Sequence, residues 1–175
     1  MRASASGPAS GSDPRVRILF VCLGNICRSP TAEAATRAAL NEAGLHDRVE
    51  LDSAGIGDWH VGNPPDRRMH AAALAAGIEL SGTARQVLAD ELASWDLIVA
   101  MDRSNHTRLR AMVADDEVRS RVRMFREFDP AAGDLDVPDP YYGNADGFAD
   151  VARICQAAAR GLVDALADRL RTGAR

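Results

Sequence analysis

Residues 18–34 constrain the fold of this chain most strongly, because they read as a buried strand, a short polar turn and the start of a helix. Cys22 closes the strand and Arg28 opens the helix. The backbone N–H groups of residues 23–28 can curl inward as a nest, and the helix start adds unpaired N–H groups and a positive dipole end. Arg28 supplies a planar fork that matches two phosphate oxygens. Because this positive field favours the thiolate form of Cys22, the stretch predicts an anion site beside a nucleophile.

A simpler interpretation treats Cys22 as an inert buried cysteine and Arg28 as a helix-start residue with a surface role. It does not explain why Gly24, Asn25 and Ser29 also stand at positions useful for one anion. The complete strand–turn–helix context is much more specific than a Cys and an Arg at this spacing. We therefore interpret the turn as a phosphate-binding loop that carries a catalytic cysteine.

Length and composition indicate one domain. The chain has 175 residues, of which 46% are hydrophobic, enough for one substantial core. We assign residues 14–171 to this domain, residues 1–13 to a disordered leader and residues 172–175 to a tail. The leader lacks the apolar segment of a secretory signal, and no apolar run reaches the length of a membrane span. Three cysteines do not form a secreted disulfide framework, so we expect a cytoplasmic protein, while export without a signal peptide would leave no mark in the sequence.

Charge and residue usage exclude several functions. The net charge of -4 predicts that nucleic acid is not a partner. All 21 basic residues are arginine, which excludes a Walker-type phosphate loop because that loop requires a lysine. The four histidines do not stand at metal-ligand spacing, so we predict no metal and no other cofactor.

Strand and helix patterns alternate along the chain, which predicts an α/β fold with a four-stranded parallel sheet between two helical layers. In such a fold the carboxyl end of the first strand is the expected ligand crevice, and the phosphate-binding loop follows that strand. The predicted strands are 15–21, 49–53, 96–101 and 121–125, and the predicted helices are 29–43, 66–76, 87–93, 104–112 and 148–171.

A long segment without periodic pattern, residues 128–146, separates the last strand from the last helix, and loops of this length tend to be functional. At its centre Pro138 and Pro140 flank Asp139 and stiffen the backbone that carries this carboxyl group. Both tyrosines of the chain, Tyr141 and Tyr142, follow directly. The alternative interpretation is an acidic turn that covers the edge of the core. Considered together with the turn that carries Cys22, however, the loop of Asp139 is better interpreted as functional.

Taken together, these residues resemble the low-molecular-weight protein tyrosine phosphatases over about residues 16–170. The segment Trp59-His60-Val61-Gly62 is similar to the bacterial, particularly the actinobacterial, branch. The acid follows the nucleophile here, whereas larger tyrosine phosphatases place it before. The blocks that carry the resemblance are Cys22-Leu23-Gly24-Asn25-Ile26-Cys27-Arg28-Ser29-Pro30, Asp52-Ser53-Ala54-Gly55, Ala84-Arg85-Gln86, Met101-Asp102-Arg103-Ser104-Asn105 and Asp139-Pro140-Tyr141-Tyr142-Gly143.

The resemblance implies a role for each site residue. Cys22 would attack phosphorus and form a phosphocysteine intermediate, while Arg28 and the loop amides would hold the equatorial oxygens. Asp139 would protonate the leaving phenolate and then activate water. Ser29 would hydrogen-bond the Cys22 sulfur, and Asn25 would hold the turn in a left-handed conformation. The other residues assigned to the phosphate-binding loop are Leu23, Gly24, Ile26 and Cys27.

Aromatic side chains would form the walls of the substrate cleft and would suit a flat phenyl ring. These are Tyr141, Tyr142 and Trp59, although Trp59 could instead be a partly buried core residue. Ile26 favours phosphotyrosine, because related protein-arginine phosphatases have a threonine at this position. Asp102 could cap the following helix or support the cradle, and the cap is the safer interpretation.

Two cysteines remain. The resemblance implies that Cys27 forms a reversible disulfide with the nucleophile under peroxide, while a small loop filler is the alternative. Related arsenate reductases require further cysteines, and here only Cys155 remains, on the apolar stripe of the last helix.

The implied function is hydrolysis of phosphotyrosine in partner proteins. Protein-arginine phosphatase or arsenate reductase activity on the same scaffold, and a non-catalytic phosphate-binding module, are the alternatives. We expect a monomer or a weak dimer.

Overall fold

The computed structural model describes residues 15–172. The predicted leader, residues 1–13, lies outside the described residues, as do residues 173–175 of the predicted tail. Thr172, the first residue of that tail, is the last residue of the final helix. The division of the chain into leader, domain and tail stays a prediction.

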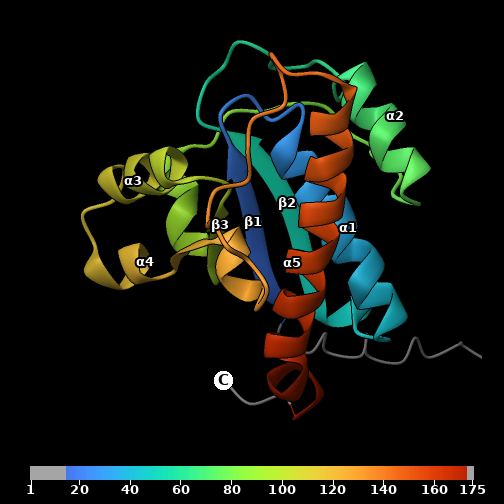
Figure 1. Cartoon of the computed structure of the whole chain (residues 1–175). Coiled ribbons are helices and arrows are strands. Elements are labelled where there is room, and N and C mark those ends of the chain that lie inside the picture. Colours follow the sequence, from blue (N-terminus) through green and yellow to red (C-terminus); the bar gives the residue numbers. More distant parts are fainter. Residues whose placement is uncertain (1–14, 173–175) are drawn as a thin grey trace, which may run out of the picture.

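Four parallel strands form one sheet in the order β2-β1-β3-β4, which confirms the predicted sheet (Figure 1). The first strand lies between β2 and β3, and its last five residues, 18–22, are buried. Ile18 and Phe20 point toward one core cluster and Leu19 and Val21 toward the other, all 0% exposed. This explains the continuous apolar run, which is typical of a strand covered on both sides. The strands are β1 (Val16–Cys22), β2 (Val49–Gly55), β3 (Leu97–Ala100) and β4 (Val122–Met124).

Helices cover both faces of the sheet, which confirms the three-layer architecture. Figure 1 shows α1 and α5 side by side on one face and α3 with α4 on the other. The regular helices are α1 (Arg28–Glu42), α2 (Arg67–Ala75), α3 (Arg103–Ala111), α4 (Asp116–Ser120) and α5 (Ala145–Thr172). Three short 3₁₀ helices are η1 (His46–Arg48), η2 (Ala89–Ser94) and η3 (Phe125–Phe128).

Three sequence-based assignments need correction. The predicted helix 87–93 begins too early, because the Val87 N–H donates to the carbonyl of Gly55 and keeps this residue extended. The last strand ends at Met124, since Phe125 already belongs to η3. Sequence analysis missed α4, whose five residues are too few for a periodic pattern, although Asp115 caps it by accepting two backbone N–H groups.

Gly161 lets α5 lie directly against the end of η3, and we expect Gly161→Ala to destabilise the protein by about 1–3 kcal/mol. A Cβ here would lie 1.8 Å from the carbonyl oxygen of Phe128, and a backbone atom cannot move aside as a flexible side chain can. The matched control is Gly147→Ala on the same helix, where the nearest heavy atom, of Pro140, is 3.7 Å away. Urea unfolding of the two variants measures the difference, and equal stability would contradict the expected clash.

Candidate active site

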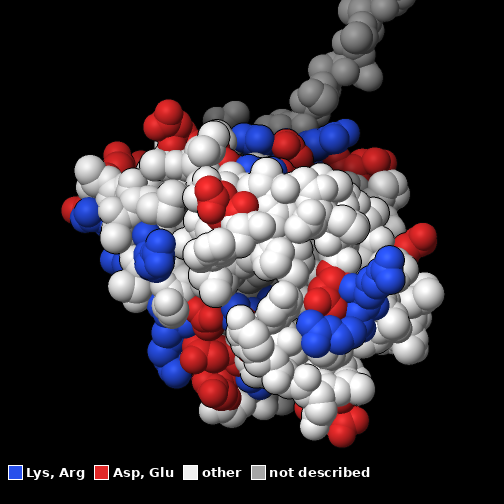
Figure 2. Space-filling view, turned by 90° about the horizontal axis from the view of Figure 1, so that it is seen from above, with Lys and Arg blue, Asp and Glu red and all other residues white. Residues whose placement is uncertain are grey.

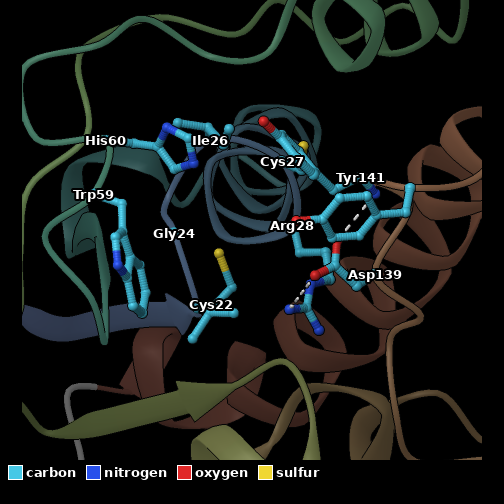
Figure 3. A pocket seen from close by; sticks show the side chains of 11 residues that line it. Cys22, Gly24, Ile26, Cys27, Arg28, Trp59, His60, Asp139 and Tyr141 are labelled. Atoms are coloured by element: carbon cyan, nitrogen blue, oxygen red, sulfur yellow. Dashed lines mark hydrogen bonds and ion pairs between the residues drawn. The ribbon is translucent and has the colours of Figure 1, made fainter.

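A cavity of about 340 Å³ opens at the carboxyl end of β1, the edge that the fold predicts for a ligand. Figure 2 looks down on this edge and shows a largely uncharged face that is hollowed near its middle. In Figure 3 the Cys22 sulfur points into the cavity between Trp59 and Asp139. The residues that line it are Cys22, Leu23, Gly24, Ile26, Cys27, Arg28, Trp59, His60, Asp139, Tyr141 and Tyr142. Two other predicted loop residues, Asn25 and Ser29, lie behind this surface and are buried.

The Cys22 sulfur has two polar contacts at the base of the loop. The Asn25 backbone N–H donates to it at 3.3 Å, and the Ser29 hydroxyl lies 3.0 Å away. The Asn25 side-chain amide donates to the same hydroxyl oxygen at 2.9 Å, so the hydroxyl hydrogen is left for the sulfur or for the more distant Ala54 carbonyl at 3.4 Å. Both contacts stabilise negative charge on sulfur.

Asn25 holds the turn in shape. Its φ angle is 59°, a left-handed value that asparagine tolerates better than most residues. Its amide nitrogen also donates to the Ser53 hydroxyl at 3.1 Å, and its amide oxygen accepts the Arg85 backbone N–H at 3.0 Å. The segments around Ser53 and Arg85, which sequence analysis recognised only as family-like blocks, therefore support the loop from behind.

Gly55 permits this close support. A Cβ at residue 55 would lie 3.0 Å from the carbonyl oxygen of Leu23 and 3.2 Å from the Cβ of Asn25. The bare backbone at this position lets β2 approach the loop, as expected where two segments of main chain pack together.

Arg28 lies at the floor of the cavity and is only 3% exposed. It donates to Asp102 at 2.6 Å and to the Val137 carbonyl at 3.1 Å, and its second terminal nitrogen lies 3.5 Å from Asp139. Burial alone would lower the pKa of this guanidinium, but the nearby Cys22 and Asp102 raise it above its usual value. The cation is therefore permanent and oriented.

Asp102 serves both roles that the sequence left open. One carboxylate oxygen holds Arg28, and the other accepts the Asn105 backbone N–H at 2.7 Å as the cap of α3. The end of β3 thus determines how the fork of Arg28 is oriented, as supporting residues in functional sites commonly do.

The loop that carries Asp139 is tied to the body of the protein at its start. Val137 donates its N–H to the Met101 carbonyl at 2.7 Å, and the Asp136 carboxylate accepts the Arg103 N–H at 2.9 Å. The side chain of Asp139 is 43% exposed and accepts the Tyr141 N–H at 3.1 Å. Water can therefore reach the carboxyl group that faces Arg28.

Aromatic rings form the rim of the cavity. Tyr141 and Tyr142 meet edge to face with ring centres 4.9 Å apart. Trp59 is 66% exposed, so the alternative that it belongs to the core is wrong. Its ring lies on the bare backbone of Gly57, where a Cβ would be 1.8 Å from the ring. Sequence analysis missed His60, whose ring centre is 6.0 Å from that of Tyr141; its place beside Trp59 was the available signal.

The other two cysteines differ in position. Cys27 lines the cavity but is 5% exposed, and burial raises the pKa of its thiol to about 12. At neutral pH this thiol is protonated and would attack an oxidised Cys22 only slowly, so its redox role stays a prediction. Cys155 is fully buried on α5, and burial also raises the pKa of its thiol.

Within residues 15–172 no three His, Cys, Asp or Glu side chains gather as potential metal ligands. None of the helices described there is long and apolar enough to cross a membrane.

A family model described as low molecular weight phosphotyrosine protein phosphatase matches residues 17–172. The chain belongs to this family, whose members are hydrolases. A curated relative from Streptomyces coelicolor, named low molecular weight protein-tyrosine-phosphatase, is 44% identical over 88% of this chain and 95% of its own length. Membership confirms the resemblance that the sequence motifs carried.

Solved structures agree with the fold of the family. The crystal structure of YfkJ from Bacillus subtilis matches with a TM-score of 0.83 and 38% identity, over 91% of this chain and 99% of that one. A Cys-to-Ser mutant of the arginine phosphatase YwlE, with a phosphorylated active-site serine, matches with a TM-score of 0.78 and 25% identity, over 89% of this chain and 98% of that one. The chain is therefore similar both to a protein-tyrosine-phosphatase and to an arginine phosphatase.

Proposed function

We propose that this protein hydrolyses phosphotyrosine in other proteins, with Cys22 as nucleophile and Asp139 as general acid and base. The observation that carries the proposal is the meeting of Cys22, Arg28 and Asp139 in one cavity, although Asp139 is more than a hundred residues away in sequence. A nucleophile, a fixed cation and an exposed carboxyl group are the groups that phosphoryl transfer from an aryl ester requires.

In the first step the Cys22 thiolate attacks phosphorus in line with the ester oxygen. The S–P bond forms as the P–O bond to the phenolate breaks, and Asp139 gives its proton to the leaving oxygen. Arg28 and the N–H groups of the loop hold the three equatorial oxygens while charge spreads over them. The Ser29 hydroxyl supports the sulfur through its 3.0 Å contact.

In the second step water attacks the phosphocysteine. Asp139, now a carboxylate, takes a proton from this water, the S–P bond breaks, and Cys22 leaves as a thiolate. The half-exposed position of the Asp139 side chain supports this role because water reaches it directly. This step releases inorganic phosphate and regenerates the thiolate, whereas the partner protein left with its dephosphorylated tyrosine residue after the first step.

The walls of the cavity support an aryl phosphate as substrate. Tyr141, Tyr142, Trp59 and His60 surround the entrance with flat rings, against which a phenyl group can pack. Ile26 adds an apolar group to the lining. A short aliphatic ester such as phosphoserine would reach the floor at Cys22 less well. Phosphotyrosine-containing proteins are therefore the proposed partners, and three free thiols suit a cytoplasmic location.

The alternatives have weaker support. An arsenate reductase would require a relay of accessible cysteines, whereas Cys155 is buried in the core at 0% exposure. A silent phosphate-binding module would not need a carboxyl group beside the cation, as Asp139 is beside Arg28. An arginine phosphatase has the closest chemistry, and substrate comparison separates it from the proposed activity.

Matched peptides that differ only in the modified residue test the substrate class. We expect kcat/KM for a phosphotyrosyl peptide to exceed that for a phosphoarginyl peptide by about 10²-fold or more, a ratio within reach of differential packing and hydrogen bonding. A phosphoseryl peptide is the control for the depth of the cavity, because its phosphate is on a short side chain. It should react more slowly than both of the other peptides. Phosphate release is measured without added metal, and a preference for phosphoarginine would reject phosphotyrosine as substrate.

A further inference from the structure

Arg68, in the first turn of α2, contacts two aromatic rings from other parts of the chain. Its guanidinium carbon lies 5.4 Å from the ring centre of Tyr141 and 4.7 Å from that of Phe148. Tyr141 belongs to the loop of Asp139, and Phe148 belongs to α5. Arginine is the cation best suited to such a position, because its flat and weakly hydrated guanidinium stacks on ring faces.

Asp66 fixes the direction of this cation. Its carboxylate accepts two hydrogen bonds from the Arg68 side chain, at 3.1 and 2.9 Å, and also caps α2 by accepting the Arg68 and Met69 N–H groups. The Asp66 backbone N–H donates to the Ile26 carbonyl at 2.9 Å, in the middle of the phosphate-binding loop. The guanidinium is therefore linked to the loop that holds the substrate phosphate.

Tyr141 links the same cation to the general acid. Its N–H donates to the Asp139 carboxylate at 3.1 Å, so the position of residue 141 determines where one carboxylate oxygen lies. Beyond Val137 the main-chain contacts of this loop are local, such as the Gly143 N–H to the Pro140 carbonyl at 2.9 Å. A contact that holds the Tyr141 ring therefore restrains the orientation of Asp139.

We propose that Arg68 is a positioning residue that aligns Asp139 with the leaving group by holding the Tyr141 ring, with Asp66 as its anchor on the phosphate-binding loop. This inference rests on the proposed function, because it gives Asp139 the role of general acid. Arg68 does not line the cavity, so it acts through Tyr141 and not on the substrate.

The test compares Arg68→Gln with wild type on two aryl phosphates. Phenyl phosphate has a poor leaving group that needs the proton from Asp139, whereas p-nitrophenyl phosphate has a good one that needs it far less. Because the Arg68 side chain is 50% exposed, we expect kcat for phenyl phosphate to fall by about 3- to 5-fold, the upper part of the range for one solvent-exposed cation–π contact expressed as a rate. The fall for p-nitrophenyl phosphate should be about twofold or less, with KM nearly unchanged.

Arg67→Gln is the matched control, because it removes the same charge from the neighbouring exposed residue of α2. It should leave the ratio of the two rates unchanged. In an Asp139→Asn background, Arg68→Gln should cause no further loss on phenyl phosphate, since the group that it positions no longer donates a proton.

Three results would overturn the inference. The first is an equal loss of kcat on phenyl phosphate and p-nitrophenyl phosphate in Arg68→Gln. The second is the same change in the ratio of these two rates in Arg67→Gln. The third is a further loss of kcat on phenyl phosphate when Arg68→Gln is added to Asp139→Asn. Turnover of p-nitrophenyl phosphate by Arg68→Gln also reports that the variant is folded. Failure of the wild-type protein to hydrolyse either ester would reject the proposed function itself, which is a separate outcome.

Discussion

Cys22→Ser is expected to reduce kcat for p-nitrophenyl phosphate on the order of 10⁶-fold, to background. A serine hydroxyl remains protonated at neutral pH, and neither group that contacts residue 22, the Asn25 N–H or the Ser29 hydroxyl, is a base that could activate it. These contacts, at 3.3 Å and 3.0 Å, can stabilise a thiolate but cannot remove a proton from serine. The variant should still bind inorganic phosphate, because Arg28 and the loop are unchanged. The readouts are turnover and protection by phosphate against thermal unfolding.

The control for Cys22→Ser is Cys155→Ala, which removes the thiol of a buried cysteine on α5. It should lower stability and leave kcat within about twofold of wild type, because Cys155 does not line the cavity and truncation of a core side chain acts mainly on folding. Activity of Cys22→Ser above a few per cent of wild type, or an equal loss in the control, would mean that the nucleophile lies elsewhere.

Asp139→Asn is expected to lower kcat for phenyl phosphate by about 10²–10⁴-fold, the usual contribution of a positioned acid. The loss for p-nitrophenyl phosphate should be much smaller, because a stable phenolate leaves without a proton. The substitution leaves Arg28, whose guanidinium lies 3.5 Å from this side chain, in place to bind the phosphate. KM should therefore stay nearly constant, and this split between kcat and KM separates an acid from a binding residue.

Asp134→Asn is the matched control for this prediction, since it removes a carboxylate that is 62% exposed on the same loop and does not line the cavity. Its kinetics should remain within about twofold of wild type on both esters, as expected for a surface substitution. Equal losses on the two esters for Asp139→Asn would show that Asp139 is not the proton donor.

Much of the fold and of the candidate site could be predicted from the sequence, because it depends on residues that are neighbours in the chain. The apolar run before Cys22 indicated a buried strand, and the polar turn with Arg28 indicated an anion site at the start of a helix. These conclusions depend on neighbours in the chain, so they could be reached without coordinates. Alternating strand and helix patterns predicted the parallel sheet. Short elements such as α4 were not predicted, because five residues are too few to show a helical period.

Contacts between distant segments were decided by the tertiary structure alone. Motif order suggested that Asp139 serves the cysteine site, but its place 3.5 Å from Arg28 depends on how the loop is held by the hydrogen bond from Val137 to Met101, directly after β3. The second role of Asp102, the exposure of Trp59, and the contact between Arg68 and Tyr141 likewise arise from packing between elements. Sequence analysis identified the residues with the required chemistry, whereas the structure determined which of them meet, because side-chain geometry depends on neighbours that the chain brings together only on folding.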